Sequence, residues 1–304
     1  MKAVDLVNRN LILVQDRNNY FFRYVKEDSI DICTTYKSGV IFRILKKIPL
    51  LSICAYPNWK KNIDEYDKII IFDSVFNVAL ALYLKIFFHK PVYVYSWNSA
   101  INLSQKKLLN KAKIFFPTFS FDKRDCASLS LKYAPMVYSR DAVQSISEEI
   151  IYDVVFVGKD KGRTKYLYEL FNMLTKSGLN CRFIILGEEK KDYIQPGFEF
   201  IEKYLSYSEN SKLIRQSKAI LDIQQDMQEG LTIRVVEAMF YEKKIITNKQ
   251  DIDTYDFYNP SNVISINKST TASQVIEFIN KDFVKLSDEI TDRYDMREWV
   301  NNFK

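Results

Sequence analysis

Residues 153–187 read DVVFVGKDKGRTKYLYELFNMLTKSGLNCRFIILG, and this stretch decides the fold. The apolar run at 153–158 predicts a buried strand, and the pattern at 162–178 predicts a helix that ends at a glycine. A second apolar run at 181–187 predicts another strand. Because a strand, a helix and a strand in this order form a βαβ unit, the stretch indicates an α/β fold with a parallel sheet.

The same alternation continues on both sides of this stretch. Toward the C-terminus it predicts helices near 208–216 and 231–241, and strands at 218–223 and 243–247. Toward the N-terminus it predicts strands at 68–72, 91–95 and 112–116 and helices at 76–88 and 122–131. Short strands separated by such helices predict two Rossmann-like sheets, because parallel strands need helical crossovers.

Length and composition favour two folded domains. The chain has 304 residues, which exceeds the usual size of one domain, and only seven Gly and seven Pro. Residues 139–152 read SRDAVQSISEEIIY, a polar and acidic segment where we place the domain boundary. No apolar segment is long enough for a signal peptide core or a membrane span, so we expect a cytoplasmic protein.

Several kinds of metal or redox site are not expected. The four cysteines lie far apart without a CxxC pair and look like reduced thiols: Cys33, Cys54, Cys126 and Cys181. The single histidine, His89, stands at an expected turn, which favours a structural role over general base catalysis. Asp251 and Asp253 form a DxD match, but such short matches are frequent, and we expect no bound metal.

Positive charge is concentrated in the first half of the chain. The net charge is +6; residues 1–150 carry 22 Lys and Arg against 14 Asp and Glu, whereas residues 151–304 carry 22 against 24. Residues 36–61 contain a basic amphipathic pattern beside Tyr and Trp, which suits an anionic membrane surface. An ordinary core-facing helix explains the pattern equally well. No nucleic-acid-binding motif accompanies the charge, so no nucleic acid partner is expected.

Residues 229–248 read EGLTIRVVEAMFYEKKIITN, with two glutamates at the ends of an apolar segment. A helix that begins just after Glu229-Gly230 would direct amide groups out of its N-terminus, where they bind phosphate well. These would be the amides of Gly230, Leu231 and Thr232. Glu237 on the apolar face requires a hydrogen-bonding partner, and a sugar hydroxyl is one candidate. A capping carboxylate and an unrelated surface glutamate are the structural alternative.

Asp73 is a further candidate in the first half. It ends the predicted strand at 68–72, on the edge of the sheet where ligand crevices form. The carboxylate could bind or deprotonate an acceptor hydroxyl, or it could cap the following helix.

The segment from Glu229 to Glu237, followed by Ala238-Met239 and KKIITN, resembles the E-x7-E segment of GT-B nucleotide-sugar glycosyltransferases, especially the family-4-like group. VFVGKDKGRTKYL resembles the start of their donor domain. GLTIRVVEA and the YDFYNP segment at 255–260 are similar to bacterial transferases of lipopolysaccharide core, O-antigen and capsule. The resemblance covers about residues 150–266 and is only architectural for residues 1–140.

This resemblance implies a division of labour in the chain. Residues 1–145 would form an acceptor-binding Rossmann-like domain, and residues 150–285 would form the nucleotide-sugar donor domain across an interdomain cleft. Residues 286–304 would form a C-terminal helix that packs back toward the N-terminal domain. The nucleotide sugar is then the donor substrate rather than a cofactor, and the acceptor is lipid-linked or an oligosaccharide at the inner face of the cytoplasmic membrane.

The resemblance also implies roles for individual residues. Gly158 ends the first donor-domain strand, and Lys159 and Arg163 after it would neutralise the donor diphosphate. Glu237 would hold the ribose hydroxyls, and Glu229 would face the transferred sugar.

Arg234 would assist the phosphates or form an ion pair on the helix surface. The amides of Gly230, Leu231 and Thr232 would add phosphate donors.

The expected activity is sugar transfer to a cell-surface glycan, with retained anomeric configuration. Two departures from the family pattern concern the N-terminal contacts and the stereochemistry: LILVQDRNNYFF lacks the Gly-rich loop, and Tyr241-Glu242-Lys243 replaces the usual glycine. A non-catalytic sugar-nucleotide-binding subunit of a polysaccharide-assembly complex is an alternative. A nucleotide-sugar epimerase is another, although a single histidine suits it less.

Overall fold

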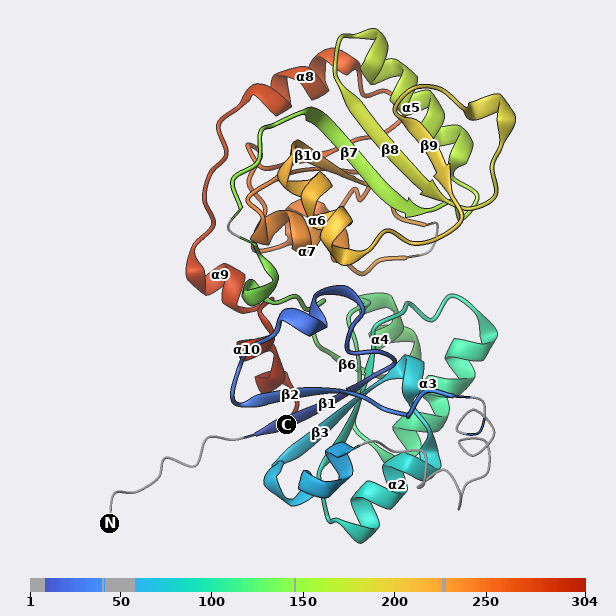
Figure 1. The fold of residues 1–304 in the computed structure, drawn as a ribbon, viewed down its shortest axis with the longest axis vertical. Helices are drawn as coiled ribbons and strands as arrows, with labels where there is room; N and C mark the ends of the chain where they lie inside the picture. The colour runs from blue at the N-terminus through green and yellow to red at the C-terminus, as the bar shows by residue number, and fades with distance from the viewer. Residues whose placement is uncertain (1–8, 40, 42–57, 145, 226–227) are drawn as a thin grey trace. The chain divides into compact units, whose positions relative to one another are not determined.

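The computed structural model describes residues 9–39, 41, 58–144, 146–225 and 228–304, and they fold into two compact units (Figure 1). Unit 1 comprises Met1–Ala142, Gln228–Leu231 and Asp292–Lys304. Unit 2 comprises Val143–Met227 and Thr232–Thr291. Each unit has its own parallel sheet.

Unit 1 is built on a parallel sheet whose described strands follow the order β2-β1-β3-β4-β5-β6. Its strands are β1 Asn10–Val14, β2 Ile30–Thr34, β3 Lys68–Phe72, β4 Val92–Ser96, β5 Thr118–Ser120 and β6 Lys132–Tyr133. Its α-helices are α2 Val78–Phe87, α3 Leu103–Phe115, α4 Lys123–Leu129 and α10 Met296–Trp299. Short 3-10 helices are η1 Tyr20–Tyr24, η3 Asn58–Glu65, η4 Asp73–Val75, η5 Arg140–Ala142 and η8 Val300–Asn302.

Unit 2 repeats the design with the strand order β12-β11-β10-β7-β8-β9. Its strands are β7 Tyr152–Lys159, β8 Cys181–Leu186, β9 Phe198–Ile201, β10 Ser217–Asp222, β11 Lys244–Thr247 and β12 Val263–Ser265. Its helices are α5 Thr164–Lys176, α6 Tyr207–Arg215, α7 Ile233–Phe240, α8 Ala272–Asn280, α9 Asp288–Asp292, η6 Lys191–Tyr193 and η7 Ile252–Thr254. α9 ends at Asp292, where the last segment of unit 1 begins.

The β7–α5–β8 segment forms as its pattern predicts. α5 buries Leu167, Leu170, Phe171 and Leu174, which recur at helical spacing and pack with the strands into one hydrophobic cluster. Burying each such side chain stabilises the fold by about 1.5–3 kcal/mol. Gly178 follows the helix with a φ of 91°, a left-handed conformation that glycine adopts without strain and that commonly ends a helix.

The last residues of the chain complete the core of unit 1. Trp299 and Phe303 are fully buried, and their rings lie 4.6 Å apart. Trp299 lies edge-on to Tyr95 of β4 at 4.8 Å, and its indole Nε1 donates to the Pro135 carbonyl at 2.9 Å. The ring of Phe303 lies 4.7 Å from that of Phe119 on β5. These contacts attach the C-terminal residues to the first sheet.

Two sequence predictions are wrong in detail. The apolar run at 112–116 is the end of α3 rather than a strand, and Ile114 is 70% exposed, so apolar character there does not signal burial. The helix expected from 231 begins at Ile233. The pattern did not predict β1, β2, β5, β6, β9 or β12, and the last four of these strands are only two to four residues long. Most of the basic segment 36–61 lies outside the described residues.

Within the described part of the chain, no helix is long and apolar enough to cross a membrane.

Each sheet contains a point where the chain reverses its direction of winding. In unit 1 the chain passes from β1 to β2 on one side and then to β3 on the other. In unit 2 the corresponding neighbours are β7 and β10. Open parallel sheets bind ligands in the crevice that forms beyond the carboxyl ends of the strands at such a switch point.

Candidate functional site

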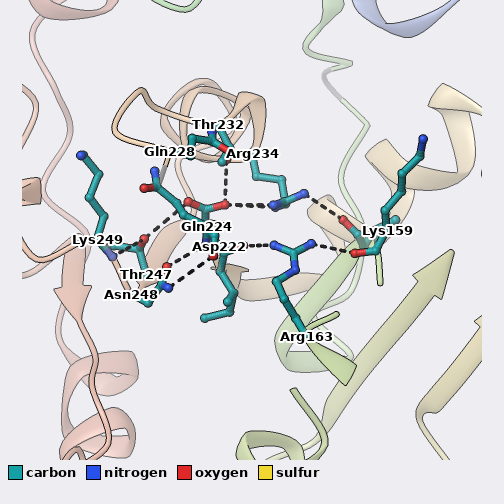
Figure 2. A network of polar contacts seen from close by, with 12 residues as sticks. Lys159, Arg163, Asp222, Gln224, Gln228, Thr232, Arg234, Thr247, Asn248 and Lys249 are labelled. Carbon is teal, nitrogen blue, oxygen red and sulfur yellow. Dashed lines mark hydrogen bonds and ion pairs between the residues drawn. The ribbon is translucent and has the colours of Figure 1, made fainter. Parts of the chain in front are cut away.

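The carboxyl ends of β7 and β10 carry a network of charged side chains, drawn in Figure 2. Lys159 ends β7, the loop that follows supplies Lys161 and Arg163, and the start of α7 supplies Arg234. We call these four residues the cation cluster. Asp222, the last residue of β10, is the acidic residue of the same network.

Asp222 and Arg234 form a buried ion pair. The Asp222 side chain is 1% exposed, and its Oδ1 accepts from Nε and Nη2 of Arg234 at 3.2 and 3.1 Å. The hydroxyls of Thr232 and Thr247 also donate to this carboxylate, at 2.7 and 3.4 Å. Nη1 of Arg234 reaches the Val157 carbonyl at 3.3 Å. The pair therefore joins the start of α7 to the ends of three strands (Figure 2).

Arg163 holds the loop after β7 against β10. Its guanidinium donates to the carbonyls of Ile223, Lys159 and Asp160, at 2.7 Å for Lys159 and 3.3 Å for Asp160. Burial, followed by the charge of Arg234, lowers the pKa of Arg163 to about 10. Three of its five N–H donors are thus used by the backbone.

An aromatic ring supports both guanidinium groups. The carbon Cζ of Arg163 lies 5.5 Å from the centroid of the Phe156 ring, and that of Arg234 lies 5.3 Å from it. Gly158 provides the space for this arrangement, since a Cβ there would lie 3.1 Å from Nη1 of Arg234 and 3.0 Å from the Phe156 ring. Gly158 therefore acts by close packing and not by an unusual φ.

Lys161 belongs to the cluster although the sequence analysis did not select it. Lys161 is an exposed residue, yet partial loss of hydration, followed by the charges of Arg163, Arg234 and Lys159, lowers the pKa of its ammonium to about 8. Its backbone is left-handed, with a φ of 49°, a conformation that non-glycine residues adopt mostly at functional sites and turns. The alternation of basic residues in KDKGR was the signal that could have identified it.

The cluster has more positive charge than the nearby carboxylates balance. Asp222 pairs with Arg234, and the carboxylate of Asp160 is engaged by Lys190 at 2.5 Å and by Thr164. The Nζ of Lys159 lies 5.3 Å from the centroid of the Tyr204 ring, and Lys159 is an exposed residue. Mutually repelling cations at a ligand-binding edge favour an anion that carries at least two charges.

Glu237 is buried within α7. Glu237 is 5% exposed, and burial raises the pKa of its carboxyl to about 7. The charge of Arg234 and a hydrogen bond with the Asn210 side chain oppose that rise. Asn210 belongs to α6, so one partner of this carboxylate is a neighbouring helix. The structure thus identifies a protein partner for Glu237 besides any ligand.

The E-x7-E stretch is divided between the two units. Glu229, Gly230 and Leu231 are assigned to unit 1, where the Glu229 N–H donates to Asp122 at 3.2 Å. A Cβ on Gly230 would lie 2.5 Å from the Phe121 ring, so glycine is required by close packing.

The helix expected to begin after Gly230 begins later, while the phosphate role expected for the amides of residues 230–232 stays a prediction. α7 begins at Ile233, and Thr232 is its N-cap, with a hydroxyl that binds Asp222 rather than the helix backbone. The amides of Gly230, Leu231 and Thr232 therefore do not form the first turn of a helix. The expected start was too early because Gly230 and Leu231 continue the apolar pattern without being helical.

Asp73 directly follows β3 of the first sheet and is 3% exposed. Its carboxylate accepts hydrogen bonds from the backbone N–H of Trp97 at 3.2 Å, the side-chain amide of Asn98 at 3.1 Å and the Ser96 hydroxyl at 3.5 Å. The side-chain amide of Gln105 donates to it as well. Burial raises the pKa of Asp73 despite these hydrogen bonds. The helix that follows is capped by Asn77 instead, so the capping alternative for Asp73 does not apply to α2.

Comparison with solved structures identifies the fold. No family model and no curated protein matches the chain. Anabaena Alr3699/HepE in complex with UDP-glucose aligns with a TM-score of 0.56 at 11% identity over 97% of this chain and 98% of that chain. An α-glucosyltransferase in complex with UDP and a mismatched 13-mer DNA aligns with a TM-score of 0.55 at 12% identity over 98% and 96%.

A third similar structure, the N-terminal domain of Candida albicans trehalose-6-phosphate phosphatase, aligns with a TM-score of 0.55 at 11% identity over 100% and 97%. Together with the two six-stranded parallel sheets of the described residues, these likenesses confirm the predicted α/β fold of GT-B type.

Proposed function

We propose that this chain is a glycosyltransferase whose donor is a nucleotide diphosphate sugar. The observation that carries the proposal is the cation cluster at the β7–β10 switch point. Its charges match a diphosphate and stabilise the nucleotide as the leaving group when the bond to the sugar breaks. UDP or UDP-glucose is bound in two of the similar structures, as their names state, which supports the same ligand class here.

The remaining donor contacts follow from this placement. We infer that Glu237 accepts hydrogen bonds from the ribose hydroxyls and that Glu229 faces the transferred sugar. Side-chain cations would supply the charge that a divalent metal ion supplies elsewhere, so we propose a donor site that works without a metal. In unit 1, Asp73 would serve the acceptor by holding the loop after β4, because protein donors already surround its carboxylate.

The acceptor class rests on the sequence resemblance. We propose a cell-surface glycan of the lipopolysaccharide, O-antigen or capsule kind, lipid-linked or oligosaccharide, and a retaining outcome. Turnover distinguishes this proposal from a non-catalytic binding subunit, which would bind the donor without releasing nucleotide from it. Analysis of the sugar product distinguishes it from an epimerase, which would leave the sugar attached to the nucleotide.

We also propose a peripheral contact between residues 36–61 and an anionic membrane at the inner face of the cytoplasmic membrane. The sequence supports it through Arg43, Lys46 and Lys47 beside apolar residues at helical spacing. Co-sedimentation with anionic vesicles, with and without Gln at these three positions, measures the contact; equal co-sedimentation of both proteins contradicts it.

The donor proposal predicts that a nucleoside diphosphate binds and stabilises the protein. In a thermal-shift panel of UDP, GDP, dTDP, ADP and CMP, we expect one base to give the largest increase in Tm, because a ligand of the folded state raises stability. Arg163→Ala should weaken the preferred diphosphate about 10- to 100-fold in calorimetry and leave its nucleoside unaffected. Lys165→Ala, an exposed α5 substitution, is the matched control. No stabilisation by any of these nucleotides contradicts the proposal.

The two glutamates should behave differently, because one is assigned to the nucleotide and the other to the sugar. Glu237→Gln should weaken the nucleotide by about 1–3 kcal/mol and raise the donor KM, as expected for a lost charge-assisted hydrogen bond. Glu229→Gln should leave nucleotide binding intact and lower kcat, because its contact forms only with the reacting sugar. Calorimetry with nucleotide alone, beside turnover of the full donor, separates these results. Normal binding and turnover in both variants would show that the spacing reflects local structure alone.

A further inference from the structure

The sheet of unit 1 carries an aromatic surface at its own switch point. Tyr20 begins η1, which follows β1, and Trp97 directly follows β4. Strands β1, β3 and β4 are neighbours in a parallel sheet, so the segments that follow them leave the same edge. The rings of Tyr20 and Trp97 lie 5.9 Å apart with an interplanar angle of 57°. We call these two side chains the aromatic shelf.

Buried aromatic rings pack against the shelf, and both of its side chains are partly exposed. The Trp97 ring lies 5.5 Å from both the Phe22 and the Phe72 rings, and both phenylalanines are buried. Tyr20 is 48% exposed and Trp97 is partly exposed. Because the buried rings support Trp97 from the core, the shelf has a defined shape before any ligand arrives.

Two further features hold the shelf in place. Asp73, itself 3% exposed, accepts hydrogen bonds from the backbone N–H of Trp97 and the side-chain amide of Asn98. These two bonds fix the loop after β4. Tyr20 has a φ of 54°, a left-handed conformation that is strained for a tyrosine. A strained residue that exposes an aromatic ring at the ligand-binding edge of a sheet indicates selection for position rather than for stability.

We propose that the aromatic shelf binds a pyranose ring of the acceptor, an inference that rests on the proposed glycosyltransferase function. One face of a pyranose presents C–H groups, which pack against aromatic faces, while its rim presents hydroxyls. The exposed Asn98 beside Trp97 offers a polar partner for such hydroxyls. Two rings at an angle with an amide at the border suit an amphipathic sugar better than a lipid chain, which needs a larger continuous apolar surface.

The tryptophans of the chain allow a direct test. The sequence contains three, and Trp59 and Trp299 are 5% and 0% exposed, so quenching of intrinsic fluorescence by acrylamide reports mainly on Trp97. The probes are the methyl pyranosides of glucose, mannose, galactose and N-acetylglucosamine. Sorbitol tests for general polyol effects, and uridine tests for a nucleobase. We expect at least one pyranoside to protect Trp97 from the quencher, and no protection by sorbitol or uridine.

Substitutions separate a binding role from a structural one. Tyr20→Ala should weaken the pyranoside about 3- to 10-fold, the size of one aromatic contact. Tyr20→Gly should weaken it similarly while leaving Tm equal to or above that of the wild type, since glycine relieves the left-handed strain. Phe87→Ala, on the 71% exposed Phe87 of α2, is the matched surface control and should bind normally.

Several results would overturn the inference. They are the absence of protection by any pyranoside, equal protection by sorbitol, protection by uridine instead, or unchanged affinity in Tyr20→Ala. Calorimetry with UDP-glucose on the same protein keeps the two proposals apart. Donor binding without a pyranoside response rejects only the shelf. A pyranoside response in a protein that none of the five nucleotides of the thermal-shift panel stabilises rejects the donor proposal and leaves the shelf as a sugar-binding site.

Discussion

Arg234→Ala is expected to lower the free energy of unfolding by about 3–5 kcal/mol, the range for removing one partner of a buried ion pair. The Asp222 carboxylate is 1% exposed, and without Arg234 it would keep only the hydroxyls of Thr232 and Thr247 as side-chain partners in the network described here. The loss should appear as a lower urea midpoint in circular dichroism, and nucleotide binding should weaken as well.

The companion variants of this prediction test its cause. The double variant Arg234→Ala/Asp222→Ala should be more stable than Arg234→Ala alone, because it leaves no unpaired buried charge. Lys165→Ala, which breaks an exposed i,i+4 pair with Glu169 in α5, should change stability only slightly. A double variant less stable than the single one would show that packing, rather than the unpaired charge, sets the cost.

Lys161→Ala is expected to weaken a nucleotide sugar about 10- to 100-fold, because it removes a cation that a diphosphate would contact. The pKa of Lys161 near 8 adds a pH signature. The free protein loses this charge as the pH rises through 8, whereas bound diphosphate favours the ammonium, so affinity should decline above pH 8. Lys161→Arg should keep high affinity and remove this decline. Calorimetry with UDP-glucose between about pH 6 and 9 measures both effects.

Glu237 should cause the affinity for UDP-glucose to fall on the acid side of the same pH profile. Its carboxyl has a pKa of about 7, so the charged form that would accept ribose hydroxyls predominates only above pH 7. Affinity should therefore rise toward neutrality and fall above pH 8, and Glu237→Gln should remove the acid limb alone. A flat profile in the wild-type protein would contradict both assignments.

The fold could be predicted from the sequence because the central strands of unit 2 are apolar runs and the helix between them is amphipathic. The prediction failed at 112–116, where an apolar run ends a helix and is exposed, and at the start of α7, where Gly230 and Leu231 extend an apolar pattern beyond the helix. In both places a local pattern was ambiguous, and tertiary packing decides the conformation.

The candidate site could be predicted only in part. Lys159 and Arg163 were selected through the family resemblance, whereas Lys161 was overlooked although basic residues alternate in KDKGR, because its altered pKa depends on neighbours that only the fold brings close. Asp222 was overlooked at the end of an apolar strand, although Asp73, which directly follows β3, was selected for a similar position. The division of residues 229–237 between two units has no sequence signal, because it depends on contacts with Phe121 and Asp122.

The contacts of Trp299 and Phe303 with Tyr95 and Phe119 have a consequence for synthesis on the ribosome. Domains generally fold in the order in which they are translated, the N-terminal one first. Here the core of unit 1 lacks two of its largest buried side chains until residues 299 and 303 have been translated, whereas unit 2 is complete once Thr291 has been added. The unit that begins the chain is therefore the last to have its full set of residues, and a nascent chain must carry β4 and β5 with part of their core uncovered throughout the translation of unit 2.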